Sequence, residues 1–317
     1  MSDKSNLRAA LSALLAFLIY STHDTVVKFL GGSYNPVQIV FFSVCLGMPV
    51  VTVMLMRDRT DGNLIPRHPW WSLARTVAAV VSGLSAFYAF TVLPLAQTYA
   101  ILFATPLLIT LLAIPVLGEK VGLHRGSAIL AGLIGVMIVI QPGSAPLTWG
   151  HAAALLSAIS GSLASIIVRK VGRDERSVVL ILYPMMANFV TMACILPFVY
   201  KPMPVEHLGL LGLMSVLAFC GMLLTIVAYR AGEAVLVAPM QYSQIIWAAL
   251  FGFLIFGESL KLNTILGAAV IIMSGLYIVM REDRTDGTMP VTRSRWRPEG
   301  IMPRVGPVMR WQKQQKR

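Results

Sequence analysis

Three polar side chains share one face of an apolar stretch near the N-terminus. Tyr20, His23 and Asp24 are spaced at i, i+3 and i+4, so a helix presents them together. A carboxylate within such a run is disfavoured by about 2.5 to 3.5 kcal/mol on membrane-insertion scales and should face protein groups or water. Two interpretations stay open. Asp24 and His23 belong to a proton or solute site, or Asp24 forms a structural ion pair with Lys28 one turn later.

A second polar set lies near the C-terminus, where Gln241, Gln244 and Trp247 recur at a spacing of three within another apolar run. Amides can bind a polar solute, and an indole can stack on a flat ring. The alternative is hydrogen bonding between helices, worth about 0.6 to 2 kcal/mol for each bond. We predict that this face lines a cavity.

Weaker candidates are other polar or aromatic side chains inside apolar runs. Packing alone, or a proline kink, is a sufficient explanation for each of them taken singly. They are Tyr88, Gln97, Tyr99, Thr105, Tyr183 and Asn188.

Two Gly-Glu pairs, Gly118-Glu119 and Gly257-Glu258, interrupt long apolar runs. A glycine can end a helix, and a carboxylate placed after it can bind free N–H groups at the start of the next helix. We therefore predict a structural role for both pairs, as a repeated motif. The alternative role is that of a gate or a proton carrier.

Other site chemistries find little support. The three cysteines, Cys45, Cys194 and Cys220, have no paired spacing that would indicate a disulfide framework or a zinc site. The five histidines are dispersed, and no G-x-x-x-x-G-K-[ST] phosphate-binding loop occurs. Asp24 is the one acid well inside an apolar run, which disfavours an enzyme with paired carboxylates. We expect no cofactor, no metal and no catalytic residues.

The composition indicates a membrane protein. The chain has 317 residues, of which 56% are hydrophobic and 13% are charged, about half the charged share of a soluble domain. Its mean hydropathy is +0.74. Run after run reaches the roughly 17 to 25 apolar residues that cross a bilayer as a helix. We predict an all-α integral membrane protein, because the alternating polarity of a β-barrel is missing from the sequence.

Ten membrane spans follow from these runs. They are Ala9–Phe29, Pro36–Met56, Trp70–Val92, Leu95–Leu117, His124–Ile140, Thr148–Val168, Val178–Tyr200, Leu208–Tyr229, Val235–Phe256 and Leu262–Met280.

The spans form an internal repeat. The two Gly-Glu pairs lie 139 positions apart, each after the fourth span of a group of five. Because five is odd, the second group enters the membrane from the opposite face, which predicts inverted repeats around a midplane cavity. The expected units are residues 7–140 and 148–280, followed by a basic tail, 281–317, that is poor in aliphatic periodicity and largely disordered.

The basic residues indicate an orientation. With the N-terminus in the cytoplasm, 23 of the 26 Lys and Arg lie on the cytoplasmic side or in the tail, and only Lys28, Lys201 and Lys261 lie outside. The net charge of +12 is therefore a topology signal, and nucleic-acid binding is not expected.

The duplicated Gly-Glu breaks in a ten-span pattern resemble the EamA-type drug/metabolite transporter superfamily. The stretch from Tyr20 to Gly31 is similar to the branch of bacterial S-adenosylmethionine and riboflavin uptake proteins, although His23-Asp24 stands where those often carry Asn-Asp.

The resemblance implies a secondary transporter in the bacterial cytoplasmic membrane. It would move a small organic metabolite, cofactor-, nucleoside- or amino-acid-like, by alternating access, and Asp24 raises proton coupling as an option. Its partners would be this solute and the lipid bilayer, and it would work as a monomer or homodimer. The alternatives are an exporter of the same fold and, from a different class, an intramembrane enzyme.

The charge pattern predicts that both termini are cytoplasmic. A reporter fused after Arg317 should be active if it works only in the cytoplasm, and a periplasm-specific reporter at the same position should be silent. The reverse result would contradict the orientation.

Overall fold

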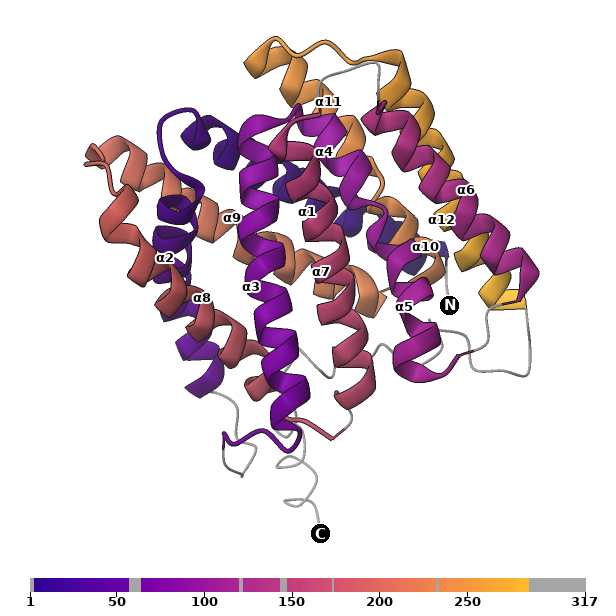
Figure 1. Ribbon diagram of the computed structural model, residues 1–317, viewed down its shortest axis with the longest axis horizontal. Helices are drawn as coiled ribbons and strands as arrows, with labels where there is room; N and C mark the ends of the chain where they lie inside the picture. The colour runs from indigo at the N-terminus through magenta and orange to yellow at the C-terminus, as the bar shows by residue number, and fades with distance from the viewer. Residues whose placement is uncertain are drawn as a thin grey trace, which may run out of the picture.

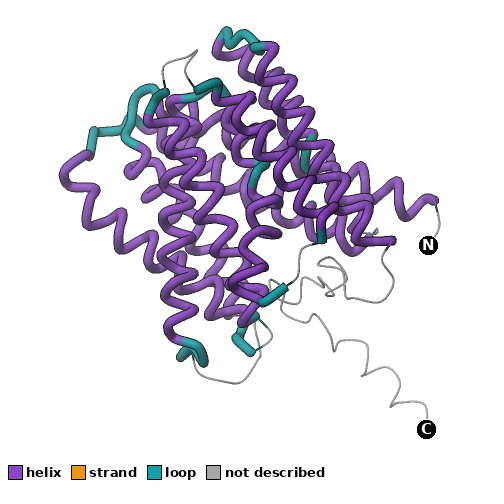
Figure 2. Tube along the Cα trace, turned by 45° about the vertical axis from the view of Figure 1, so that its right-hand side comes forward, coloured by secondary structure: helices purple, strands orange, loops and turns teal. Residues whose placement is uncertain are grey.

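The computed structural model of the protein describes residues 3–56, 64–119, 122–142, 147–172, 174–231 and 234–284. In these residues the regular elements are all α-helices, packed side by side in a bundle (Figures 1 and 2). This confirms the predicted all-α class. Most of the expected tail lies outside the described residues, since the last helix ends at Arg284.

The helices follow the predicted spans closely. In chain order they are α1 Asp3–Gly31, α2 Pro36–Met56, α3 Pro69–Val92, α4 Leu95–Leu102, α5 Thr105–Leu117, α6 Leu123–Ile140, α7 Trp149–Val171, α8 Ser177–Val199, α9 Val205–Ala231, α10 Ala234–Met240, α11 Ser243–Phe256 and α12 Leu262–Arg284.

Their lengths and surfaces suit a bilayer. Among the described residues, 8 helical stretches are long and apolar enough to cross a membrane, and Pro36–Pro49 and Leu262–Ile278 are shorter apolar helices. Large apolar side chains such as Phe198, Ile246 and Phe253 are well exposed on the outside of the bundle, as lipid contact requires. The pattern is compatible with ten spans.

The fourth and ninth spans are not continuous helices, contrary to the prediction. The first break lies at Phe103 and Ala104, between α4 and α5. Pro106 has no N–H to donate to the carbonyl of Leu102, and the hydroxyl of Thr105 donates to that oxygen instead, at 2.6 Å. The hydroxyl therefore satisfies the acceptor that proline leaves free.

The second break lies at Gln241 and Tyr242, the equivalent place in the repeat, between α10 and α11. The N–H groups of these two residues donate to the carbonyls of Ala238 and Pro239, three residues back, at 3.2 and 3.1 Å. The chain therefore tightens to a 3₁₀ turn here. Both halves thus contain a discontinuous helix, a feature that inverted-repeat transporters use at their solute sites.

The two halves interleave. The most extensive helix pairs, α3 with α7, α1 with α9 and α6 with α12, each join the first half to the second. Figure 1 shows α3 beside α7 and α6 beside α12. The pair α1 with α9 is the inverted counterpart of α7 with α3, so the buried core belongs to both halves together.

Glycines bring the backbones of α6 and α12 into contact. A Cβ added to Gly135 would lie 2.9 Å from the carbonyl oxygen of Gly267 and 2.8 Å from Ile271. A Cβ added to Gly267 would lie 2.6 Å from the carbonyl oxygen of Gly135. Small residues at such positions let membrane helices pack closely.

This contact predicts that Gly135→Ala lowers the thermal stability of the purified protein. The new methyl group must push the backbone of α12 away, at a cost of about 1 to 3 kcal/mol. Gly126→Ala on the same helix is the control, because its Cβ would meet nothing within 4 Å. Equal melting temperatures for the two variants would show that the contact is not tight.

Candidate functional site

Asp24 lies in the interior of the bundle, and both of its carboxylate oxygens have partners. Oδ1 is 2.7 Å from Nδ1 of His23, and Oδ2 accepts a hydrogen bond from the hydroxyl of Tyr99. The Asp24 side chain keeps 18% of its surface accessible and His23 keeps 12%. The acid is therefore held by protein donors and still reachable by a small molecule.

Lys28 is not the partner of Asp24. Its ammonium lies 2.5 Å from Oε1 of Glu258, so the predicted alternative of a structural Asp24–Lys28 pair is wrong. The reason is that Glu258, which the sequence places 230 residues away, reaches the same end of α1. Asp24 instead contacts His23 and Tyr99.

Tyr99 of α4 ties this centre together. Its side chain is 4% exposed, its hydroxyl donates to Asp24, and Nε2 of Gln244 lies 3.5 Å from the same oxygen. The three side chains come from α1, α4 and α11, and so from both halves. From the sequence, Tyr99 was only one of the weaker candidates. The available signal was its position one turn before the proline break.

Aromatic rings enclose these polar groups. The ring of His23 meets Phe87 edge-on with centroids 6.2 Å apart. Tyr99 contacts Phe90 at 5.3 Å and Phe103 at 5.9 Å. Polar interactions are stronger in such an apolar surround than in water, and flat solutes can stack on the rings.

Two candidates on α11 and α8 carry buried polar atoms with no hydrogen-bond partner in the described part of the chain. These atoms are Nε1 of Trp247 and Oδ1 of Asn188, and Oγ of Ser243 shares this state. Buried polar atoms are nearly always paired, so these atoms mark places where a further partner is expected. Gln241 lies at the break between α10 and α11.

Tyr20 lies one turn before Asp24 on α1 and packs on α9. A Cβ added to Gly221 would lie 2.9 Å from its ring, so the glycine makes room for the tyrosine. This contact belongs to the large α1–α9 interface between the halves. Tyr20 thus anchors the helix that carries Asp24.

Three other candidates do not join the Asp24 cluster. Nε2 of Gln97 lies 3.1 Å from Nε2 of His151, and the hydroxyl of Thr105 is occupied at the helix break. Tyr183 is 38% exposed and donates to the carbonyl of Leu64 at 3.2 Å. Their observed contacts hold helices and loops together.

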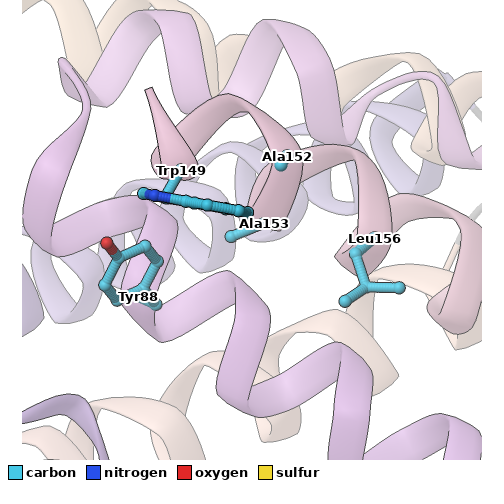
Figure 3. A pocket seen from close by; sticks show the side chains of 5 residues that line it. All are labelled: Tyr88, Trp149, Ala152, Ala153 and Leu156. Atoms are coloured by element: carbon cyan, nitrogen blue, oxygen red, sulfur yellow. The ribbon is translucent and has the colours of Figure 1, made fainter. Parts of the chain in front are cut away.

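Tyr88 lines a separate, shallow cavity of about 400 Å³ between α3 and α7. Figure 3 shows its ring beside the indole of Trp149, with Ala152, Ala153 and Leu156 along the same wall. Trp149 is 79% exposed. The lining is nearly all apolar and comes from two helices, so this hollow is distinct from the Asp24 centre.

The two Gly-Glu motifs form contacts between the halves. Glu258 binds Lys28, and its Oε2 accepts the N–H of Leu95 at 3.0 Å. Glu119 binds Arg169 at 2.5 Å. Glu258 does cap a helix, but it caps α4 of the other half. The prediction that it caps the helix following it is therefore wrong, because the turn at Gly257 directs the side chain back across the bundle.

Among the residues that the structure describes, no three His, Cys, Asp or Glu side chains gather closely enough to hold a metal ion. The polar centre offers one acid, one imidazole, the phenol of Tyr99 and the amide of Gln244. Such groups can form hydrogen bonds with a polar solute.

The comparison with known proteins fits this geometry. The model of the EamA-like transporter family matches residues 7–141 and 148–281. The chain belongs to the EamA-like transporter family. It is a multi-pass membrane protein, and the family resemblance of its motifs is confirmed.

The relatives of this EamA-family chain include an uptake transporter, a transporter whose name gives no direction, and an exporter. An S-adenosylmethionine uptake transporter of Rickettsia prowazekii is 23% identical over 276 residues, covering 86% of this chain and 92% of the relative. A riboflavin transporter of Rhizobium johnstonii is 29% identical over 226 residues, covering 69% and 73%. A pseudopaline exporter of Pseudomonas aeruginosa is 24% identical over 267 residues, covering 83% and 93%.

One solved structure has the same fold, with a TM-score of 0.56 at 20% identity. The match covers 85% of this chain and 97% of the chain of known structure.

The role of Tyr99 in this EamA-family protein predicts that Tyr99→Phe is destabilising. The change leaves Asp24 and Gln244 without a hydroxyl partner in a buried place, which costs about 1 to 3 kcal/mol. Thermal unfolding of the purified variant measures the loss. Tyr200→Phe, at a side chain that is 51% exposed, is the control. Equal stabilities would mean that the Tyr99 hydroxyl is not bonded as described.

Proposed function

We propose that this EamA-family protein is a secondary transporter that moves a small organic metabolite across the bacterial cytoplasmic membrane by alternating access. In this proposal Asp24 lies in the solute pathway and both chain termini are cytoplasmic. One observation carries it: an accessible acid in the C-terminal half of α1 is bonded to Tyr99 of α4, beside a helix break that recurs in the other half.

The chemistry of the centre favours a particular kind of solute. The Asp24 carboxylate complements a cationic or amino group, and Gln244 can bind carbonyl or hydroxyl groups. The surrounding rings, Phe87 and Phe103 among them, suit a flat or partly apolar body. These properties support a cofactor-, nucleoside- or amino-acid-like metabolite, in line with the names of the relatives.

The same acid supports proton coupling as part of this proposal. An ionised Asp24 accepts hydrogen bonds at both oxygens from His23 and Tyr99. A proton or a cationic solute group can neutralise it, and the two compete for one carboxylate. Such competition couples proton movement to solute movement. An enzyme is not proposed, because the relatives are named as transporters.

The solute can be found by measuring thermal stability of the purified protein in a panel of metabolites, with S-adenosylmethionine and riboflavin as the first probes. A true ligand at 100 times its Kd should raise the unfolding free energy by about 2.7 kcal/mol. Each metabolite that stabilises the protein is then radiolabelled, and its uptake into and release from sealed vesicles containing the protein are measured.

Asp24→Asn tests the role of the acid in the same vesicles. The amide keeps the shape and most hydrogen bonds but cannot ionise, so we expect net transport driven by a pH gradient to fall to background. Glu206→Gln is the control, at an exposed acid in the first turn of α9. If solute exchange survives while pH-driven transport is lost, Asp24 carries the proton, and if both are lost, it binds the solute. A fully active Asp24→Asn at every pH would remove Asp24 from the mechanism.

A further inference from the structure

The two ion pairs at the Gly-Glu motifs are related by the internal repeat. Lys28 and Arg169 are equivalent residues, 141 positions apart, and Glu119 and Glu258 are equivalent, 139 positions apart. Lys28 of the first half binds Glu258 of the second, and Arg169 of the second half binds Glu119 of the first, each at 2.5 Å. Each half therefore supplies the cation of one ion pair and the carboxylate of the other.

The pairs lie at opposite ends of the bundle. Glu258 contacts the N–H of Leu95, where α4 begins, and Glu119 directly follows α5. Since α4 and α5 together make one span, the two carboxylates are separated by the length of that span (Figure 1). We call the ion pair of Lys28 and Glu258 the Lys28 gate, and the ion pair of Arg169 and Glu119 the Arg169 gate.

A second reciprocal contact accompanies each gate. At the end of α1, the hydroxyl of Tyr34 lies 2.6 Å from Nδ1 of His207. In the inverted position, Oε1 of Glu175 accepts the N–H of His68 at 2.6 Å. Tyr34 is equivalent to Glu175, and His68 to His207, by the same offsets. Each end is therefore closed by two polar contacts between the halves.

The local backbone is built to hold the Lys28 gate. Gly257 has a φ of +64°, which turns the chain so that the N–H of Glu258 bonds the carbonyl of Gly252 at 2.9 Å. A Cβ at Gly252 would lie 2.5 Å from Oε2 of Glu258, so the glycine leaves space for the carboxylate. Lys28 in turn donates to the carbonyl of Leu93 and lies over the ring of Phe256.

The side chains of both ion pairs keep some contact with water. The side chains of Lys28 and Glu258 are 12% and 17% accessible, and those of Arg169 and Glu119 are 22% and 29% accessible. Water can therefore replace each partner when the pair separates, which keeps the cost of breaking it moderate. A fully buried pair would lock the halves together.

We infer that the two pairs are the opposing gates of the transport cycle. Opening one end breaks its pair while the pair at the other end still holds the halves together, so Asp24 is exposed to one side at a time. Both pairs are formed in this structure. This inference rests on the proposed alternating access.

Site-directed labelling tests the gates without any solute. Cys45, Cys194 and Cys220 are replaced by alanine, and Ser21→Cys provides a single thiol. Ser21 is 1% exposed and lies three residues before Asp24, on the same face of α1. A membrane-impermeant maleimide is added to vesicles of each orientation. The parent should label slowly from both sides.

Lys28→Met should raise the labelling rate roughly fivefold from the side that carries Lys28 and leave the other side unchanged, the shift that loss of a partly exposed ion pair can produce. Arg169→Met should do the same from the opposite side. Lys28→Arg keeps the charge and should label like the parent. Arg8→Met and Lys261→Met each remove an exposed cation, one on each predicted side of the membrane, and should also label like the parent, because neither is part of a gate.

Faster labelling from both sides at once, or from neither, would overturn the inference. If a methionine variant fails to fold, Lys28→Cys with Glu258→Cys replaces it: the crosslinked pair should block labelling of Ser21→Cys from that side, and unchanged labelling would equally overturn the inference. Transport by Asp24→Asn is a separate readout. Sided labelling with an active Asp24→Asn would keep the gates and reject the proposed solute site.

Discussion

A chain that crosses lipid must satisfy its backbone hydrogen bonds internally, and this constraint governs the structure. It makes every regular element in the described residues a helix, and it makes an interrupted helix costly unless other groups take over the lost bonds. At the break between α4 and α5 the hydroxyl of Thr105 takes the carbonyl that Pro106 leaves. At the other break the chain tightens to bonds three residues apart. The interruptions survive because both are buried in protein, around the polar centre.

The polar centre depends on these interruptions. Tyr99 lies just before the first break, and Gln244 lies just after the second. Their side chains meet Asp24 because the inverted arrangement brings the two broken helices to the same helix, α1, which contacts α11 as well as the first half. The site is thus composite, and neither half contains it alone.

Much of this was predictable from the sequence. Long apolar runs and the spacing of the Gly-Glu pairs gave the helices, their order and the inverted repeat, because these features are set by local chain properties. The polar faces at Tyr20 to Asp24 and at Gln241 to Trp247 were visible for the same reason. The interaction partners of these side chains were not predictable from the sequence. Lys28 is one turn from Asp24 in sequence, and only the packing of distant helices shows that it binds Glu258 instead.

The helix breaks show the same limit. Thr105-Pro106 indicates a kink, but the equivalent of Pro106 in the second half is Ile245, and the proline there, Pro239, lies before the break and not after it. That break depends on its surroundings, where Phe103 and Tyr242 meet edge to face at 5.1 Å. Aromatic contacts between the two breaks are long-range information that periodicity does not contain.

The cap on α4 has a consequence for how the protein is made. The free N–H of Leu95 and the ammonium of Lys28 find their carboxylate in Glu258, 163 residues beyond Leu95. Because the chain is made from its N-terminus, this carboxylate does not yet exist when α1 and α4 have been synthesised. The cap on α4 and the ion pair of Lys28 can therefore form only after the segment that follows α11 has been made.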